Sequence, residues 1–132
     1  MIEAQAEVLL NYVGGEWTPS QSGAKAPVRN PATSETIALV PLSPAEEVDQ
    51  AVAAAMKAYP EWRETPVVDR IKPLFKLRDL LTAHLDELAR TITNEAGKTY
   101  GESLAEMQRG VENVEVACGA PILLQGYNNE DI

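Results

Sequence analysis

Apolar residues recur every three or four positions over most of residues 43–121, and this periodicity constrains the fold more than any other feature of the sequence. Such spacing places the apolar side chains on one face of an α-helix. Three stretches show the pattern, separated by prolines and glycines. The sequence therefore predicts three amphipathic helices, and each helix needs another element against which to bury its apolar face.

Proline, glycine and capping residues predict the ends of the first and third helices. Ser43, with Glu46 three residues later, fits a capping box, and Pro60 is expected to stop the first helix. Gly119 is expected to end the third helix. The third helix has the most regular apolar stripe, formed by Leu104, Met107, Val111, Val114 and Cys118.

The second predicted helix contains a proline close to its start. The apolar pattern begins after Pro66, and Gly97 is expected to cap the C-terminal end. Pro73 would then lie in the second turn, where a proline removes a helical hydrogen bond. Two alternatives follow: the helix kinks at Pro73, or it starts later with Asp69 as its cap.

Residues 1–42 follow a different pattern, in which short apolar runs are broken by turn residues. Gly14 and Gly15 separate two such runs and supply the positive φ values that a tight hairpin requires. Asn30 and Pro31 begin a second turn between two further runs. This region predicts two consecutive β-hairpins.

The predicted fold is a single α+β domain over residues 1–132, with hairpins in residues 1–42 and three helices in residues 43–121. Residues 122–132 form a separate tail. The tail begins with the apolar run Ile122–Leu124 and enters a turn with no partner strand after it. We expect it to be the beginning of a structure that is cut off.

Charge and composition exclude several functions. The chain has 20 acidic and 11 basic side chains, a net charge of −9, and neither half offers the basic face that nucleic acid or an anionic membrane requires. One cysteine and one histidine are too few for a zinc site, and no apolar run is long enough to span a membrane. Two acids near the N-terminus argue against a signal peptide. We expect a cytoplasmic protein without a metal.

No motif amounts to an active site. The segment Ala96–Thr99 resembles part of a phosphate-binding loop, but position 92 lacks the first glycine, and Gly97 is expected to close a helix. Cys118 lies in an apolar stripe, which favours a packing role over a nucleophilic one. The sequence therefore assigns no catalytic, cofactor-binding or metal-binding residue.

Several segments of the chain, taken in order, form a recognisable series: Asn11–Trp17, Asn30–Ile37, Ser43–Trp62, Glu95–Thr99, Glu106–Glu112 and Ala117–Pro121. This series resembles the aldehyde dehydrogenase superfamily, and within it the methylmalonate-semialdehyde dehydrogenases. Ser34 departs from the pattern, because glycine is usual at that position of the family.

This resemblance covers nearly the whole chain but only an N-terminal quarter of a typical family member. It implies an enzyme that oxidises a semialdehyde with NAD and coenzyme A. The family's catalytic cysteine, general-base glutamate, asparagine and cofactor-binding turn have no matching positions here. We therefore expect an incomplete cofactor domain that lacks its parallel sheet, binds no cofactor and has no enzymatic activity as this chain.

Three hypotheses for the function follow. The first is a truncated dehydrogenase-like module that covers its remaining apolar surface by forming a homodimer. The second is a small protein that binds an aliphatic molecule, such as a fatty acid, in a groove between helices. The third is a regulator that docks on a full-length dehydrogenase. The residues predicted to form the groove or interface are Leu81, Leu85, Leu88, Met107, Val111, Val114, Ile122, Leu123 and Leu124.

Overall fold

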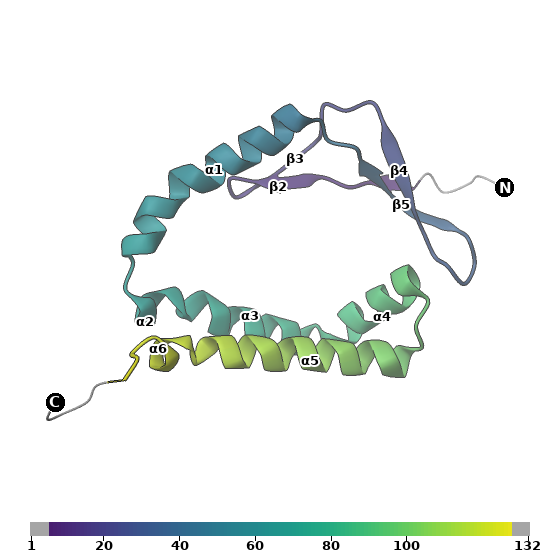
Figure 1. The fold of residues 1–132 in the computed structure, drawn as a ribbon. Helices are drawn as coiled ribbons and strands as arrows, with labels where there is room; N and C mark the ends of the chain where they lie inside the picture. Colours follow the sequence, from purple (N-terminus) through teal and green to yellow (C-terminus); the bar gives the residue numbers. More distant parts are fainter. Residues whose placement is uncertain (1–5, 128–132) are drawn as a thin grey trace, which may run out of the picture. The chain divides into compact units, whose positions relative to one another are not determined.

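The computed structural model describes residues 6–127, which form two compact units of strands and helices (Figure 1). Unit 1 extends to Arg63 and includes the short segment Asn94–Gly97. Unit 2 contains Glu64–Thr93 and the described residues from Lys98 onward. The class is α+β, as predicted, but the helices are more numerous than the three expected.

Unit 1 contains both predicted hairpins. Strands β2 (Asn11–Val13) and β3 (Glu16–Thr18) pair antiparallel, and the glycines between them have φ values of 64° and 92°. Strands β4 (Lys25–Arg29) and β5 (Thr36–Pro41) also pair antiparallel. The two turns form where the glycine pair and the Asn-Pro pair predict them.

A further strand pairing was not predicted. Strand β1 (Glu7–Val8) pairs in parallel with β5 and completes a sheet of order β1-β5-β4. The sequence analysis treated residues 8–13 as one run, whereas the structure divides it between β1 and β2. A parallel pairing of distant segments leaves no local pattern in the sequence, because it depends on the path of the chain between them.

The turn between β4 and β5 holds a serine in the left-handed region. Ser34 has a φ of 62°, and its amide donates to the Asn30 carbonyl over 2.7 Å. The Asn30 side chain accepts from the Ala32 amide over 2.9 Å, which supports the tight turn. For a residue with a Cβ, this backbone conformation costs about 1–2 kcal/mol of stability, whereas glycine adopts it without this cost.

Helix α1 (Ala45–Glu64) is longer than predicted. The expected end at Pro60 is wrong, because the helix continues for another turn beyond it. A proline inside a helix removes the hydrogen bond of one amide but does not require the chain to leave the helix. At the other end, the Glu47 and Val48 amides donate to the Pro44 carbonyl. The Ser43 hydroxyl accepts from Asn11 Nδ2 and donates to Ser20 Oγ.

The second predicted helix is three helices: α2 (Val67–Arg70), α3 (Lys72–Ala83) and α4 (Leu85–Ala96). Pro73 lies in the first turn of α3, where its missing N–H would have no helical partner. Asp69 does not cap this start; its carboxylate pairs with Lys72 Nζ at 2.6 Å. The chain therefore accommodates Pro73 by ending α2 at Arg70 and beginning α3 at Lys72.

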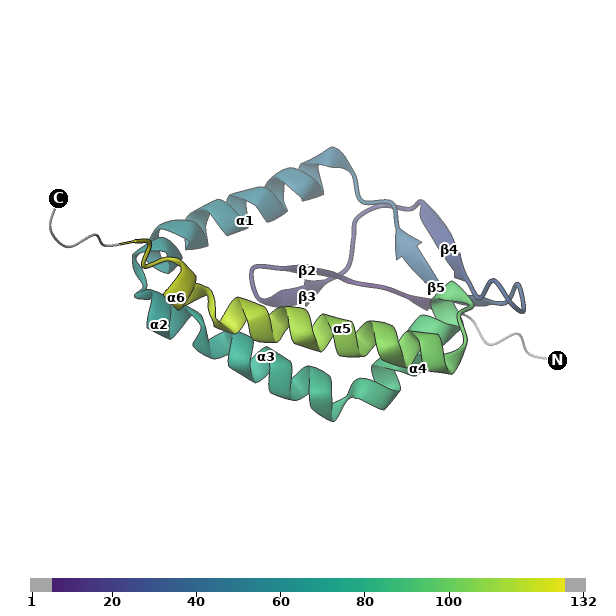
Figure 2. The ribbon, with the colours of Figure 1, turned by 60° about the horizontal axis from the view of Figure 1, so that its bottom comes forward.

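The third predicted helix is α5 (Tyr100–Cys118), followed by the short α6 (Ala120–Leu123). Thr99 and Glu102 form a reciprocal capping box at the start of α5, which the sequence analysis did not identify. Helices α3 and α5 pack side by side in both views (Figure 2). Among the described residues of unit 2, the buried side chains are few and small: Ala89, Ser103 and Cys118.

No helix within residues 6–127 has the length and apolar character needed to cross a membrane.

Replacing Ser34 by glycine is expected to stabilise the chain. Glycine adopts the φ of 62° without steric cost, so the free energy of unfolding should rise by roughly 0.5–1 kcal/mol after the larger entropy of unfolded glycine is counted. Urea unfolding followed by circular dichroism measures this change. Ser34→Ala is the matched control, since alanine keeps the Cβ and should give no gain.

Gly97→Ala is expected to destabilise unit 1. Gly97 has a φ of 68°, and a Cβ there would lie 2.7 Å from Pro31 Cγ. We expect a loss of more than about 1 kcal/mol, because both the backbone and the proline would have to shift. The control Gly110→Ala lies in α5 with open space around its Cβ, and it should be neutral or stabilising in the same unfolding experiment.

Candidate functional site

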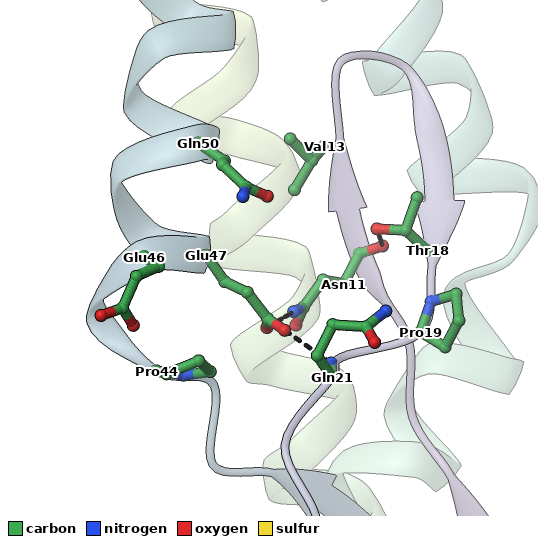
Figure 3. Close-up of a pocket in the computed structure, with 9 residues that line it drawn as sticks. All are labelled: Asn11, Val13, Thr18, Pro19, Gln21, Pro44, Glu46, Glu47 and Gln50. Atoms are coloured by element: carbon green, nitrogen blue, oxygen red, sulfur yellow. Dashed lines mark hydrogen bonds between the residues drawn. The ribbon is translucent and has the colours of Figure 1, made fainter.

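A polar cleft of about 370 Å³ lies between the β2–β3 hairpin and the first turns of α1 in unit 1 (Figure 3). Asn11 and Thr18 come from the hairpin, Gln21 from the loop after it, and Glu47 and Gln50 from α1. The cleft combines polar side chains from several elements of this unit.

The carboxylate of Glu47 is the centre of this cleft. One oxygen accepts a hydrogen bond from the Gln21 amide over 2.6 Å, and the other accepts from Asn11 Nδ2 over 3.3 Å. The same Asn11 amide group donates to Ser43 Oγ over 2.8 Å. The Gln21 amide contributes most, with Ser20 next, to holding the pKa of Glu47 below its ordinary value.

These bonds decide what the cleft can do chemically. Glu47 stays ionised at neutral pH, and both of its oxygens are engaged by groups of the chain itself. A carboxylate in this state is a poor general base. The arrangement instead attaches the hairpin and its following loop to the start of α1.

A second cleft, of about 440 Å³, lies in unit 2 where α3 and α4 meet α5. Leu85 and Val111, two of the residues predicted for the apolar groove, line it. The remaining lining is polar: Thr82, Gln108 and Glu112. The structure therefore brings two of the predicted groove residues together, beside a carboxylate.

The other predicted groove or interface residues divide into two groups. Leu81, Leu88, Met107 and Val114 are half-buried on the helices of unit 2. By contrast, α6 and the residue after it expose their apolar side chains: Ile122, Leu123 and Leu124. The predicted ligand and homodimer stay predictions.

A polar cluster that the sequence analysis missed joins α4 to α5. Arg90 binds both oxygens of Asp86 over 3.0 and 3.2 Å, and the Tyr100 hydroxyl donates to Asp86 Oδ1 over 2.7 Å. Arg90, followed by Tyr100, holds the pKa of Asp86 below its ordinary value, and the bond to Asp86 raises the pKa of Tyr100. The four-residue spacing of Asp86 and Arg90 was visible in the sequence, but the contact with Tyr100 was not.

The apolar face of α1 is uncovered within unit 1. The helix has no buried residue. Five large apolar side chains, spaced three or four positions apart, are each between 48% and 65% exposed. We call this face the α1 stripe; it consists of Val48, Val52, Met56, Tyr59 and Trp62.

Within residues 6–127, no group of three or more histidine, cysteine, aspartate or glutamate side chains is placed to hold a metal ion. Cys118 is 8% exposed at the C-terminal end of α5. Gly97 follows the last residue of α4, as predicted, and a helix does open after the segment Ala96–Thr99. Thr99 accepts from the Glu102 amide there, which engages an N–H that a phosphate would need.

Comparison with known proteins gives a consistent set of relatives. The profile of the aldehyde dehydrogenase family matches residues 17–131. Malonate-semialdehyde dehydrogenase 2 of Geobacillus kaustophilus is 51% identical over 126 residues, which are 96% of this chain and 26% of the relative. Malonate-semialdehyde dehydrogenase of Halalkalibacterium halodurans is 47% identical over 129 residues, 98% of this chain and 27% of the relative.

Solved structures of similar proteins share the fold. A crystal structure of methylmalonate-semialdehyde dehydrogenase from Oceanimonas doudoroffii matches with a TM-score of 0.87 at 37% identity, over 97% of this chain and 26% of that one. A putative methylmalonate-semialdehyde dehydrogenase from Sinorhizobium meliloti, solved with NAD, matches with a TM-score of 0.89 at 29% identity, with the same coverage of both chains. This chain thus spans about a quarter of the proteins it resembles.

Glu47→Gln is expected to weaken the attachment of the hairpin to α1 in a pH-dependent way. Because folding lowers the pKa of Glu47, its stabilising effect is present above the ordinary value of 4.5 and is lost as the pH falls through the folded value. The variant should therefore unfold at lower urea than the parent at neutral pH, and the two curves should converge in acid. Glu46→Gln removes the same charge from the same helical turn and should change the midpoint little. A gap between parent and Glu47→Gln that is equally wide in acid would contradict the role assigned to the carboxylate.

Proposed function

The chain belongs to the aldehyde dehydrogenase family, and from this premise we propose that it is a structural module of a malonate- or methylmalonate-semialdehyde dehydrogenase and has no catalytic activity by itself. Relatives with these names match it over nearly its whole length, but the match covers only 26% of each of the first two. The module contributes packing surface, and the reacting groups belong to the other part of the fold.

The observation that carries this proposal is the uncovered α1 stripe. A helix of 20 residues in a folded domain normally buries its apolar face against another element. Helix α1 buries none of its residues, although its side chains have the spacing of a helix that packs on one face. Such a face supports a role as one part of a larger folded unit.

The described polar groups support the absence of catalysis by this chain. The carboxylates of Glu47 and Asp86 both accept hydrogen bonds from neighbouring groups of the chain. Cys118, the single cysteine, lies almost buried at the end of a helix, where an aldehyde has poor access. These groups serve packing and attachment.

The described residues also do not fit a bound NAD. The segment that most resembles a phosphate loop follows a helix, whereas a pyrophosphate site follows a strand. Thr99 and Glu102 satisfy each other at the start of α5. In the proposed whole enzyme, NAD and coenzyme A are held by other parts of the fold.

The cleft in unit 2 gives less support to the alternative of a fatty-acid carrier. Only Leu85 and Val111 supply apolar surface there, and the carboxylate of Glu112 lies beside them. This charge would repel the head group of a fatty acid. A homodimer and a regulator that docks on a dehydrogenase both remain hypotheses, and both would use exposed apolar surface of the kind found on α1.

A chimera tests the proposed function. The segment of the Geobacillus kaustophilus enzyme that aligns with this chain would be replaced by the chain, which is 51% identical to it. We expect the chimera to reduce NAD with malonate semialdehyde and coenzyme A at a rate of the same order as the parent enzyme, and we expect the chain alone to give no turnover. Turnover by the chain alone, or a chimera that does not fold into an active enzyme, would contradict the proposal.

A further inference from the structure

We propose that the cleft of unit 2 binds a short alkylammonium ion. The ammonium group meets the carboxylate of Glu112, and the carbon chain lies on Leu85 and Val111. The site is independent of the proposed function, because every residue that lines it belongs to unit 2 and none needs the other part of a dehydrogenase.

The cleft lies beside α5, where the chain changes direction between α3 and α4 (Figure 2). Helix α3 packs along α5, and the backbone leaves the helical conformation at His84, one residue before α4 begins. Thr82 lies in the last turn of α3, and Leu85 is the first residue of α4. One wall of the cleft therefore combines a hydroxyl group with an apolar side chain.

The other wall is formed by three residues of α5: Gln108, Val111 and Glu112. Residues three and four positions apart share one face of a helix, so the amide, the isopropyl group and the carboxylate line the cleft together. Leu85 and Val111 are half-buried, whereas Gln108 and Glu112 are exposed. The cleft thus combines a half-buried apolar part with an exposed polar part.

Two polar side chains of the cleft are unpaired among the described residues. Within residues 6–127, neither the amide of Gln108 nor the carboxylate of Glu112 takes part in a hydrogen bond or an ion pair. The Thr82 hydroxyl donates to the Arg78 carbonyl over 2.9 Å, which leaves its lone pairs free to accept. The cleft therefore offers oxygen acceptors from an amide, a hydroxyl and a carboxylate, and the N–H donors of an ammonium group match them.

Arginines close to the cleft in sequence have other acidic partners. Arg78 pairs with Asp79 over 2.7 Å, and Arg109 interacts electrostatically with Glu106. The chain also has a net charge of −9, which raises the local concentration of cations and lowers that of anions. The charge of Glu112 is therefore available to a cationic ligand, and it selects against a carboxylate.

An NMR titration with n-pentylammonium chloride tests the site. Amide proton–nitrogen correlation spectra of the chain would be recorded in phosphate buffer, which contains no amine. We expect saturable shifts at Thr82, Leu85 and residues 108–112, with a Kd of about 1–10 mM, because a ligand of so few atoms gains little binding energy. Titrations with n-pentanol and with pentanoate keep the carbon chain but remove or reverse the charge, and both should give much weaker shifts.

Glu112→Gln keeps the shape of the side chain and removes its charge. It should weaken the binding of n-pentylammonium at least about threefold, the scale expected for an exposed ion pair, and leave the circular dichroism of the chain unchanged. Glu64→Gln is the matched control. It removes the same charge from the end of α1, outside the cleft, and should leave the affinity unchanged.

Saturable shifts that are confined to the cleft and weakened by Glu112→Gln alone would support the site. Shifts that spread over the acidic surface and are the same in both variants would show nonspecific attraction of a cation and would overturn it. Shifts of equal size and affinity with n-pentanol would identify an apolar cleft without charge recognition and would also overturn it, as would the absence of saturable shifts. Each of these contrary results would leave the proposed function intact.

Discussion

A helix can bury its apolar face only where another element supplies the opposing surface, and most of this structure follows from where that condition is met. Helix α5 has α3 alongside it, and its stripe residues Leu104, Met107 and Val111 are half-buried. Within unit 1, helix α1 has the hairpin near one side, and its large apolar residues are exposed. The difference between the two helices lies in the available partner and not in their own periodicity, which is similarly clear in both.

Polar contacts hold the elements together locally where the apolar core is small. Glu47 attaches the hairpin region to α1, and Asp86 joins Arg90 and Tyr100 across α4 and α5. Glu47 is half-buried and the Asp86 cluster is exposed, and at such solvent-accessible positions each contact contributes little to stability. The polar contacts set the geometry of neighbouring elements. Burial of apolar surface, which supplies most of the folding free energy, is incomplete on α1.

The sequence predicted the structure correctly where one local rule determines it. Its predictions were wrong or incomplete where contacts between distant parts of the chain determine the structure. Gly14 and Gly15 require a tight turn, and the hairpin is present. Pro73 marked a break, but the sequence did not show that a new helix begins beside it, because a proline is equally compatible with a kink. Pro60 failed as a stop for the same reason. The contact of Tyr100 with Asp86 depends on how two helices lie together, which no spacing rule reveals.

The heat-capacity change of unfolding tests the central claim that this chain leaves much of its apolar surface uncovered. A compact domain of 132 residues would give about 1.6–2 kcal/mol/K, since this quantity follows the apolar area exposed on unfolding. Differential scanning calorimetry on a sample shown to be monomeric by light scattering measures it. The account predicts a value below this range, because many large apolar side chains, those of the α1 stripe among them, are already exposed in the folded chain. A value in the full range of a compact domain would contradict it.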